Sequence, residues 1–224
     1  MNKIFVDLEM TYLSRKQRKL NPAYVNEIIE IGAVKLNEEN EIIETYKQFV
    51  SPEISTEISE YITNLTGITT DMVAGQPVLK DVITDFAAWC GDDFLVYAWS
   101  DHDLTQVQKE LSFKGIEITE SLSFLLNHWV DFQKEFGALV HIKRSIKLSD
   151  AIDLIGEDFF GKAHDALTDA YNTAMLYKLV MEQKSFARIK RILDEAFSEH
   201  HGFTMGEIFN FNLIENTDII SSEE

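Results

Sequence analysis

Apolar runs of strand length alternate along the chain with segments whose apolar residues recur at helical spacing. Three strands are predicted early, over residues 3–10, 28–37 and 41–50, and the polar Glu-Glu-Asn between the last two suits a hairpin turn. A fourth, fully buried strand is predicted at 94–99. The segment after the first strand is polar and basic, and we expect it to be a connection that runs through Pro22.

Helices are predicted mainly after the third strand. Short helical pieces are expected within 54–74, around the turn-like Thr66-Gly67, and a helix over 78–90 is expected to end at Gly91. The stretch 120–136 is ambiguous, because Trp129-Val130 could end a strand or lie within a helix. Further helices are predicted at 103–113, 146–155, 166–182 and 185–200. Three strands in meander order, followed by alternating helix and strand, indicate an α/β sandwich with a mixed sheet.

The composition narrows the class of protein. The chain has 224 residues, which suits one domain with an appendage better than two full domains. Its single cysteine, Cys90, excludes an internal disulfide and a zinc site built from cysteines. The longest apolar run, from Phe94 to Trp99, is far shorter than the about 20 residues that span a bilayer, and acids interrupt the first apolar stretch, so no secretory signal is visible. We expect a soluble, cytoplasmic protein with no membrane partner.

The net charge of −18 argues against a nucleic-acid binder that works by overall charge. The cations are nevertheless concentrated in three acid-free segments, at 15–19, 141–147 and 184–191. Each segment could simply be a solvated loop or helix face. Whether the three share a face is open at this point.

Two acids lie inside the first predicted strand. Asp7 and Glu9 are two positions apart, so both carboxylates point to the same face of the sheet. Burying two like charges side by side is costly unless a cation compensates them, and oxygen ligands favour Mg²⁺ or Mn²⁺ over zinc. The alternative is an exposed strand end whose acids are solvated.

A second group of polar residues lies at the start of the predicted helix 166–182. Asp165 is a plausible N-cap, and Asp169 follows within about one turn. His164, on the preceding loop, can converge with Asp169 on one site. An imidazole beside metal-bound water is suited to proton abstraction near neutral pH.

A third group directly follows the buried strand at 94–99. The carboxyl edge of a sheet usually presents functional groups, and both Asp101 and Asp103 lie there. One of them could instead cap the next helix. If Asp103 is the functional acid, Ser100 or Asp101 can still serve as the cap.

These residues form an ordered set that, together with FVDLEMT (5–11), EIIEIGAV (27–34) and LTGIT (65–69), resembles the DEDDh group of DnaQ-like 3′→5′ exonucleases. The resemblance covers roughly residues 3–182. Within that group, VSPEIS, LTGIT and the spacing from Trp99 to Asp103 are most similar to KapD-like bacterial proteins and to eukaryotic exonucleases that trim small RNAs and histone mRNA.

The resemblance implies an α/β, RNase H-like three-layer sandwich with a mixed central sheet. It assigns an exonuclease domain to residues 1–182, and leaves 183–224 as a C-terminal helical extension with a polar tail. It implies two bound ions, Mg²⁺ or Mn²⁺, held by four carboxylates, with an imidazole as general base and three residues bordering the substrate. By position, the metal ligands are Asp7, Glu9, Asp103 and Asp169, the base is His164, and the bordering residues are Met10, Thr11 and Leu65.

The implied activity is metal-dependent 3′→5′ hydrolysis of single-stranded nucleic acid from its 3′ end, with nucleoside 5′-monophosphates as products and RNA weakly favoured over DNA. The basic residues at 15–19 would be well placed to attract phosphates. Two alternatives stay open: a phosphodiesterase acting on very short oligonucleotides, and a catalytically silent module that binds nucleic acid. Leu65 could equally be a core residue, Asp101 could replace Asp103 as the ligand, and the oligomeric state is not readable.

Overall fold

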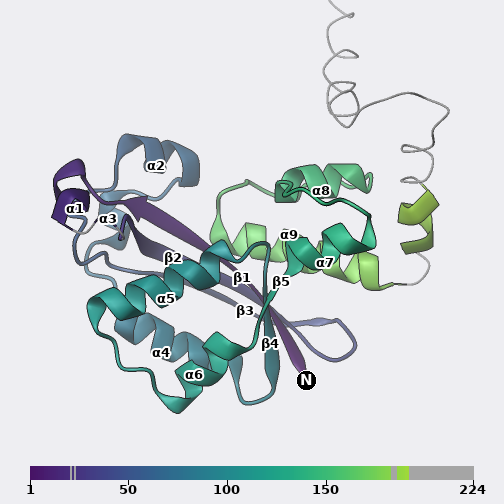
Figure 1. Ribbon diagram of the computed structural model, residues 1–224, viewed down its shortest axis with the longest axis horizontal. Helices are drawn as coiled ribbons and strands as arrows, with labels where there is room; N and C mark the ends of the chain where they lie inside the picture. Colours follow the sequence, from purple (N-terminus) through teal and green to yellow (C-terminus); the bar gives the residue numbers. More distant parts are fainter. Residues whose placement is uncertain (21, 23, 183–185, 192–224) are drawn as a thin grey trace, which may run out of the picture.

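The computed structural model of the protein describes residues 1–20, 22, 24–182 and 186–191. One five-stranded sheet runs through its centre in the order β3-β2-β1-β4-β5 (Figure 1). β2 pairs antiparallel with β1 and β3, whereas β4 pairs parallel with β1 and β5, so the predicted mixed sheet is confirmed. The strands are β1 (Asn2–Tyr12), β2 (Asn26–Leu36), β3 (Ile42–Phe49), β4 (Phe94–Ala98) and β5 (Trp129–Asp131).

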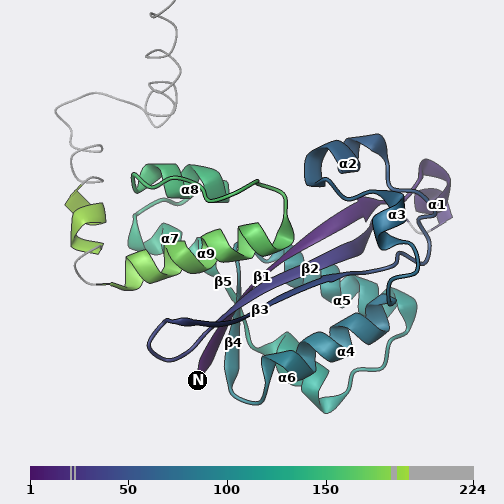
Figure 2. The ribbon, with the colours of Figure 1, turned by 180° about the vertical axis from the view of Figure 1, so that it is seen from behind.

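Helices cover both faces of the sheet, as the two opposite views make plain (Figures 1 and 2). One face carries α4 (Leu79–Cys90), α5 (His102–Lys114) and α6 (Glu120–Asn127). The other carries α7 (Phe132–Leu139), α8 (Leu148–Leu154) and α9 (Ala166–Met181). Three short helices, α1 (Arg15–Leu20), α2 (Glu60–Thr66) and α3 (Thr70–Val73), lie at the end of the molecule where β1 finishes. The three-layer sandwich is therefore confirmed.

Successive side chains of β1 point to opposite faces of the sheet, so they contribute to two separate parts of the core. Ile4, Val6 and Leu8 pack with the helices α4 to α6, whereas Phe5 packs with α7 to α9. Because side chains alternate along a strand, the odd positions that follow Phe5 also face α9. That face is the one on which Asp7 and Glu9 lie.

The ambiguous stretch 120–136 contains two helices and a very short strand. Thr119 caps α6 by accepting a hydrogen bond from the amide of Leu122, and Asp131 caps α7 in the same way through Lys134. Trp129 lies between them in β5, opposite Val96 of β4. The strand interpretation of Trp129-Val130 is thus correct, and the flanking residues are helical.

The basic segment after β1 is a helix, α1, and the expectation of a mere connection was wrong. Ser14 and Gln17 form a reciprocal capping box: the Gln17 amide donates to Oγ of Ser14 (3.3 Å), and the Ser14 amide donates to Oε1 of Gln17 (2.7 Å). These two bonds satisfy amide groups at the start of a helix that would otherwise lack partners. The cations of 15–19 therefore lie on a short helix.

A buried ion cluster fastens α5 to β2. The ammonium of Lys114, at the end of α5, lies 2.9 Å from a carboxylate oxygen of Glu110 and 3.3 Å from one of Glu27, and both acids are fully buried. The Glu27 carboxylate also accepts hydrogen bonds from the backbone amides of residues 53–55. This cluster fixes the direction of α5, whose first turn carries Asp103.

The described residues include only part of the C-terminal segment for which a helix was predicted. Residues 186–191 are helical, with Ile189 buried against the core of α7 to α9, and the remainder of the helix predicted at 185–200 lies outside the described residues. The division of the chain after residue 182 stays a prediction. Within the described residues, no helix has both the length and the hydropathy expected of a membrane-spanning segment.

Candidate active site

Asp7 and Glu9 project from β1 beneath the start of α9. Glu9 is only 7% exposed and Asp7 is partly buried, so solvation of a strand end does not explain the pair. The pairing of β1 with β2 shifts register between Glu9 and Met10. Such irregularities interrupt the alternation of side chains and are common beside active sites. The two carboxylates are the last residues on this face before the shift.

The parallel neighbour of β1 delivers Asp103. Ala98 at the end of β4 pairs with Val6, and the chain then turns into α5, with Asp103 buried in its first turn. Asp101, at the N-cap position of that helix, is exposed and lies 3.0 Å from the ammonium of Lys134. Of the two candidate acids, Asp103 is the buried one, and it is the one whose charge acts on the pKa of Asp7.

Gly32 allows the first turn of α9 to lie directly on the sheet. A Cβ atom at this position of β2 would lie 2.1 Å from the nitrogen of Leu167 and 2.2 Å from the carbonyl carbon of Ala166. No residue with a Cβ atom can be accommodated at position 32 while the backbone of α9 lies this close. Because the helix starts in contact with the strand, Asp169 in its first turn reaches the carboxylates of β1.

Two further residues hold this helix start and were missed by sequence reasoning. Glu30 of β2 is buried, and its carboxylate accepts a hydrogen bond from the amide of Ala166 (3.3 Å). Lys47 of β3 pairs with both Glu30 and Asp165. Asp165 is the predicted N-cap, and its side chain accepts from the amide of Thr168 (2.9 Å). An acid inside the apolar run 28–34 of this strand was the signal that could have identified Glu30.

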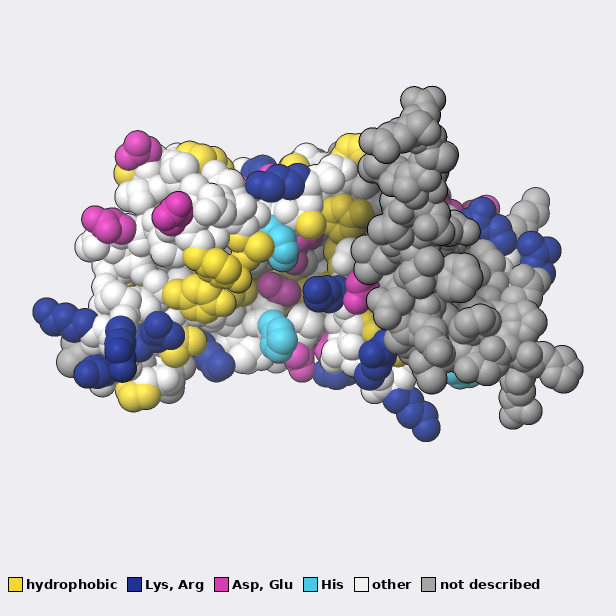
Figure 3. Space-filling model, turned by 90° about the horizontal axis from the view of Figure 1, so that it is seen from above, with side chains coloured by type: hydrophobic (Ala, Val, Ile, Leu, Met, Phe, Trp, Pro, Cys, Tyr) yellow, Lys and Arg dark blue, Asp and Glu magenta, His cyan; other side chains and the backbone are white. Residues whose placement is uncertain are grey.

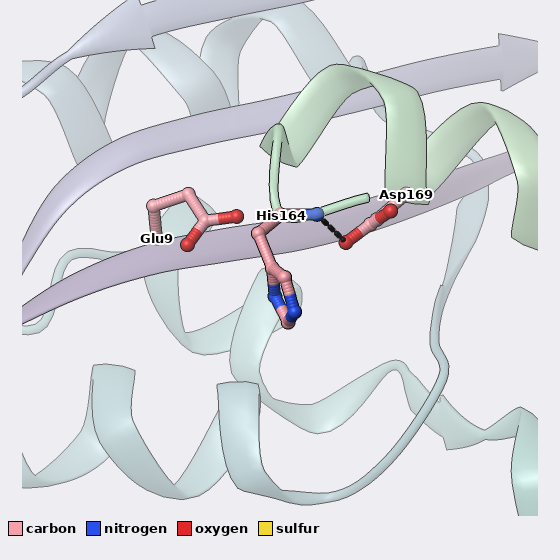
Figure 4. A group of neighbouring side chains, drawn as sticks. All are labelled: Glu9, His164 and Asp169. Carbon is pink, nitrogen blue, oxygen red and sulfur yellow. Dashed lines mark hydrogen bonds between the residues drawn. The ribbon is translucent and has the colours of Figure 1, made fainter. Parts of the chain in front are cut away.

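His164 lies at the surface immediately before α9. Its backbone has a φ of 64°, in the left-handed region that residues with a side chain rarely adopt. The amide of His164 donates to Oδ2 of Asp169 (3.1 Å), and Figure 4 shows the imidazole extending away from that bond. One ligand atom each of Glu9, His164 and Asp169 lies within 4.8 Å of the others. A strained backbone held by a hydrogen bond is typical of a functional position.

The carboxylates of the site are protonated more readily than ordinary acids. Burial, followed by the charges of Asp169 and Glu30, raises the pKa of Glu9 to about 8. Burial raises the pKa of Asp103 to about 7 and that of Asp169 to about 6, in the second case against the opposing hydrogen bond from His164. Burial and the neighbouring Asp103 also raise the pKa of Asp7 well above its ordinary value.

This arrangement fits divalent cations. Among the described residues, no lysine or arginine forms an ion pair with any of the four carboxylates. Oδ1 of Asp169 is buried and has no hydrogen-bond partner in the part of the chain that the structure describes. Clustered carboxylates without cationic side-chain partners are suited to hard cations with oxygen ligands, such as Mg²⁺ or Mn²⁺.

The three residues expected to border a substrate have different exposures. Met10 follows the register shift in β1 and is half-buried, and Leu65 of α2 is also half-buried. Thr11 is only 1% exposed, so its side chain is not available at the surface. Figure 3 shows acidic and histidine side chains near the middle of one face, with a group of hydrophobic side chains on one side and Lys or Arg side chains on both sides.

The family of the chain follows from comparison with known sequences. The RNase_T exonuclease family model matches residues 4–177, which includes all four carboxylates and His164. The chain belongs to this exonuclease family. The match spans β1 through most of α9, the elements that build the site.

The relatives of the chain include proteins named as exoribonucleases and as DNA polymerases. The 3′-5′ exoribonuclease 1 of Rattus norvegicus is 30% identical over 181 residues, which cover 77% of this chain and 52% of the relative. The human protein of the same name is 31% identical, over 75% of this chain and 50% of its own length. DNA polymerase III PolC-type of Clostridium perfringens is 31% identical over 85% of this chain but 12% of the relative. The chain thus spans about half the length of the exoribonucleases it matches.

Solved structures share the DnaQ-like exonuclease fold. The nuclease domain of 3′hExo, described as a DEDDh family member bound to rAMP, superposes with a TM-score of 0.69 at 25% identity, over 80% of this chain and 91% of that chain. Exonuclease I of E. coli in complex with a dA16 oligonucleotide gives a TM-score of 0.62 at 16% identity, over 88% of this chain and 43% of that chain. At that identity, the second likeness concerns the fold alone.

Proposed function

We propose that the protein is a metal-dependent 3′→5′ exonuclease that hydrolyses single-stranded nucleic acid to nucleoside 5′-monophosphates. The observation that carries the proposal is the convergence of four carboxylates and one imidazole from β1, α5 and the start of α9. Membership of an exonuclease family supports the reaction class.

The metal ligands in this proposal are the carboxylates of Asp7, Glu9, Asp103 and Asp169, holding two Mg²⁺ or Mn²⁺ ions. When bound, such ions lower the pKa of water and stabilise charge on a phosphoryl group and its leaving oxygen. The four acids supply the negative charge that retains the cations, and burial of Glu9 and Asp103 keeps those two side chains in place.

His164 is the general base. Its exposed ring can take a proton from the attacking water and pass it to solvent, while its backbone stays fastened to Asp169. Met10 and Leu65 would border the terminal nucleotide, with Thr11 contributing backbone groups only, because its side chain is buried.

RNA is the favoured polymer and DNA the alternative. Two of the relatives are named exoribonucleases, and 3′hExo is described with rAMP bound, whereas the polymerase relative is named for DNA. Recognition of a 2′-hydroxyl would decide the preference. A cytoplasmic location remains a prediction.

The test follows 5′-labelled single-stranded RNA and DNA oligomers incubated with the protein and Mg²⁺ or Mn²⁺. A descending ladder of single-nucleotide steps that disappears with EDTA and in Asp169→Ala is the expected result. No shortening of either polymer with either ion would overturn the proposal for long substrates. Hydrolysis of dinucleotides alone would instead favour the phosphodiesterase alternative, and binding without hydrolysis would favour the silent module.

A further inference from the structure

A basic cleft adjoins the carboxylate site on the side of α7 and α8. It encloses about 840 Å³ between the β4–α5 connection, the first part of α7 and the segment 142–147 that leads to α8. Its lining includes Trp99 to His102, the residues that directly precede Asp103. The cleft therefore opens beside one of the proposed metal ligands. α2, which carries Leu65, lies toward the other end of the molecule (Figures 1 and 2).

The charge of the cleft is opposite to that of the whole protein. Four cationic side chains and two acids line it, in a chain whose net charge is −18. Both acids, Asp101 and Asp131, are ion-paired with Lys134, at 3.0 Å and 2.7 Å. Lys143 and Lys147 are exposed and make no ion pair with any acid of the described residues. Two positive charges are thus presented to solvent at the rim, with Arg144 between them.

The backbone that carries these lysines is held at both ends. The carbonyl of Ile146 accepts hydrogen bonds from Nε1 of Trp99 (3.1 Å) and Nε2 of Gln133 (2.8 Å). The amide of Ile142 donates to the carbonyl of Gly137 (2.8 Å), and a Cβ atom at Gly137 would lie 2.7 Å from the Ile142 oxygen. The loop is therefore fastened to the same segment that leads to Asp103, and its cations have a defined position relative to the site.

We propose that this cleft binds backbone phosphates of the nucleic-acid strand on the 5′ side of the scissile phosphate, through Lys143 and Lys147. The inference rests on the proposed function and adds the path of the substrate. The terminal nucleotide lies toward Leu65 and Met10, and the strand leaves the site across the β4–α5 connection into the cleft. Contacts between lysines and backbone phosphates do not depend on the base sequence. The affinity that they add decreases as the salt concentration rises.

The test compares two substrates and two double variants. A 12-nucleotide single-stranded oligomer spans the cleft, whereas the p-nitrophenyl ester of thymidine 5′-monophosphate occupies the site alone. Lys143→Ala/Lys147→Ala removes the proposed contacts. Lys80→Ala/Lys109→Ala is the matched control, because it removes two exposed lysines from α4 and α5, on the opposite face of the sheet.

We expect Lys143→Ala/Lys147→Ala to lower kcat/KM for the oligomer roughly 5- to 30-fold, mainly through KM, as two exposed charge pairs would. The slope of log(kcat/KM) against log[salt] should fall by about 1.4, since each lost contact to a single strand contributes about 0.7. Hydrolysis of the small ester should stay unchanged, and the control variant should resemble the wild type on both substrates.

Three results would overturn the inference. If both double variants degrade the oligomer alike, the cleft does not bind the strand. If the small ester is affected as strongly as the oligomer, the loop acts on the catalytic site. If the wild-type protein hydrolyses neither substrate, the proposed function itself fails, which is distinguishable from the first two results.

Discussion

Replacing Gly32 by alanine would put a methyl group where the backbone of α9 now lies. The new carbon would be 2.1 Å from the nitrogen of Leu167 and 2.7 Å from the carbonyl oxygen of Ala166, and neither atom belongs to a flexible side chain. Ordinary contact requires about 3.4 Å or more, so the helix start must move away from the sheet by roughly 1 Å. Asp169 and the backbone of His164 would move with it.

The cost can be worked out for stability and for activity separately. Overpacking of this kind costs about 1–3 kcal/mol, and we expect the upper part of that range because backbone must move. For a chain of this size, about 2–3 kcal/mol corresponds to a Tm lower by roughly 4–12 °C. A displacement of about 1 Å at a catalytic group costs on the order of 10²-fold in rate. The activity loss should therefore exceed what partial unfolding at 25 °C would produce.

The assay pairs the Tm from thermal unfolding with kcat/KM for a single-stranded oligomer, and the kinetics are measured at 25 °C, below the transition. Val34→Ile is the matched control, because Val34 is buried on the same face of β2 and the change also enlarges a side chain against α9 by one carbon. The control should lose some stability and keep its activity. If Gly32→Ala has the activity of Val34→Ile, close contact between β2 and α9 does not position the site.

Three further predictions concern the site and its support. His164→Ala should lower kcat by about 10²- to 10⁴-fold, whereas Asp101→Asn should stay within about twofold of the wild type in the same oligomer assay. A raised carboxylate pKa, about 8 for Glu9, means that the folded state binds more protons, so without metal the Tm should fall as the pH rises from 5 to 8. Mg²⁺ should then raise the Tm more at pH 8 than at pH 5, and a Tm in EDTA that rises over this range would contradict the assignment. Lys114→Met should cost about 3–5 kcal/mol in chemical unfolding, because it leaves the buried Glu27 without its cation; a cost below about 1 kcal/mol would argue against the ion cluster.

Local sequence patterns were sufficient to predict most strands of the sheet and to single out the acids that lie within apolar segments. Asp7 and Glu9 interrupt an apolar strand, so their unusual environment is visible in eight residues of sequence. β5 was ambiguous because a strand of three residues is too short to show an alternating period. The start of α1 could have been predicted from the capping pair Ser14 and Gln17. The segment was instead interpreted as a connection because it is rich in cations.

The support of the site depends on pairs of residues that are distant along the chain. Gly32 matters because Ala166 lies on it, and Lys47 matters because Asp165 is its partner. Neither of these two contacts follows a periodic pattern or a fixed spacing, so a single sequence does not reveal them. The environments of Asp101 and Asp103 likewise depend on the folded structure: Lys134 pairs with the first, and the second is buried.

Diffraction from crystals grown with Mn²⁺ and a nucleoside 5′-monophosphate would test the central claim most directly, since the anomalous signal of manganese locates the ions without assumptions about the protein. We predict peaks bounded by the carboxylates of Asp7, Glu9, Asp103 and Asp169, with the phosphate of the nucleotide beside them and the imidazole of His164 facing it. Peaks at Asp101 or elsewhere on the surface, with none between the four carboxylates, would contradict the assignment of this site as the metal-dependent active centre.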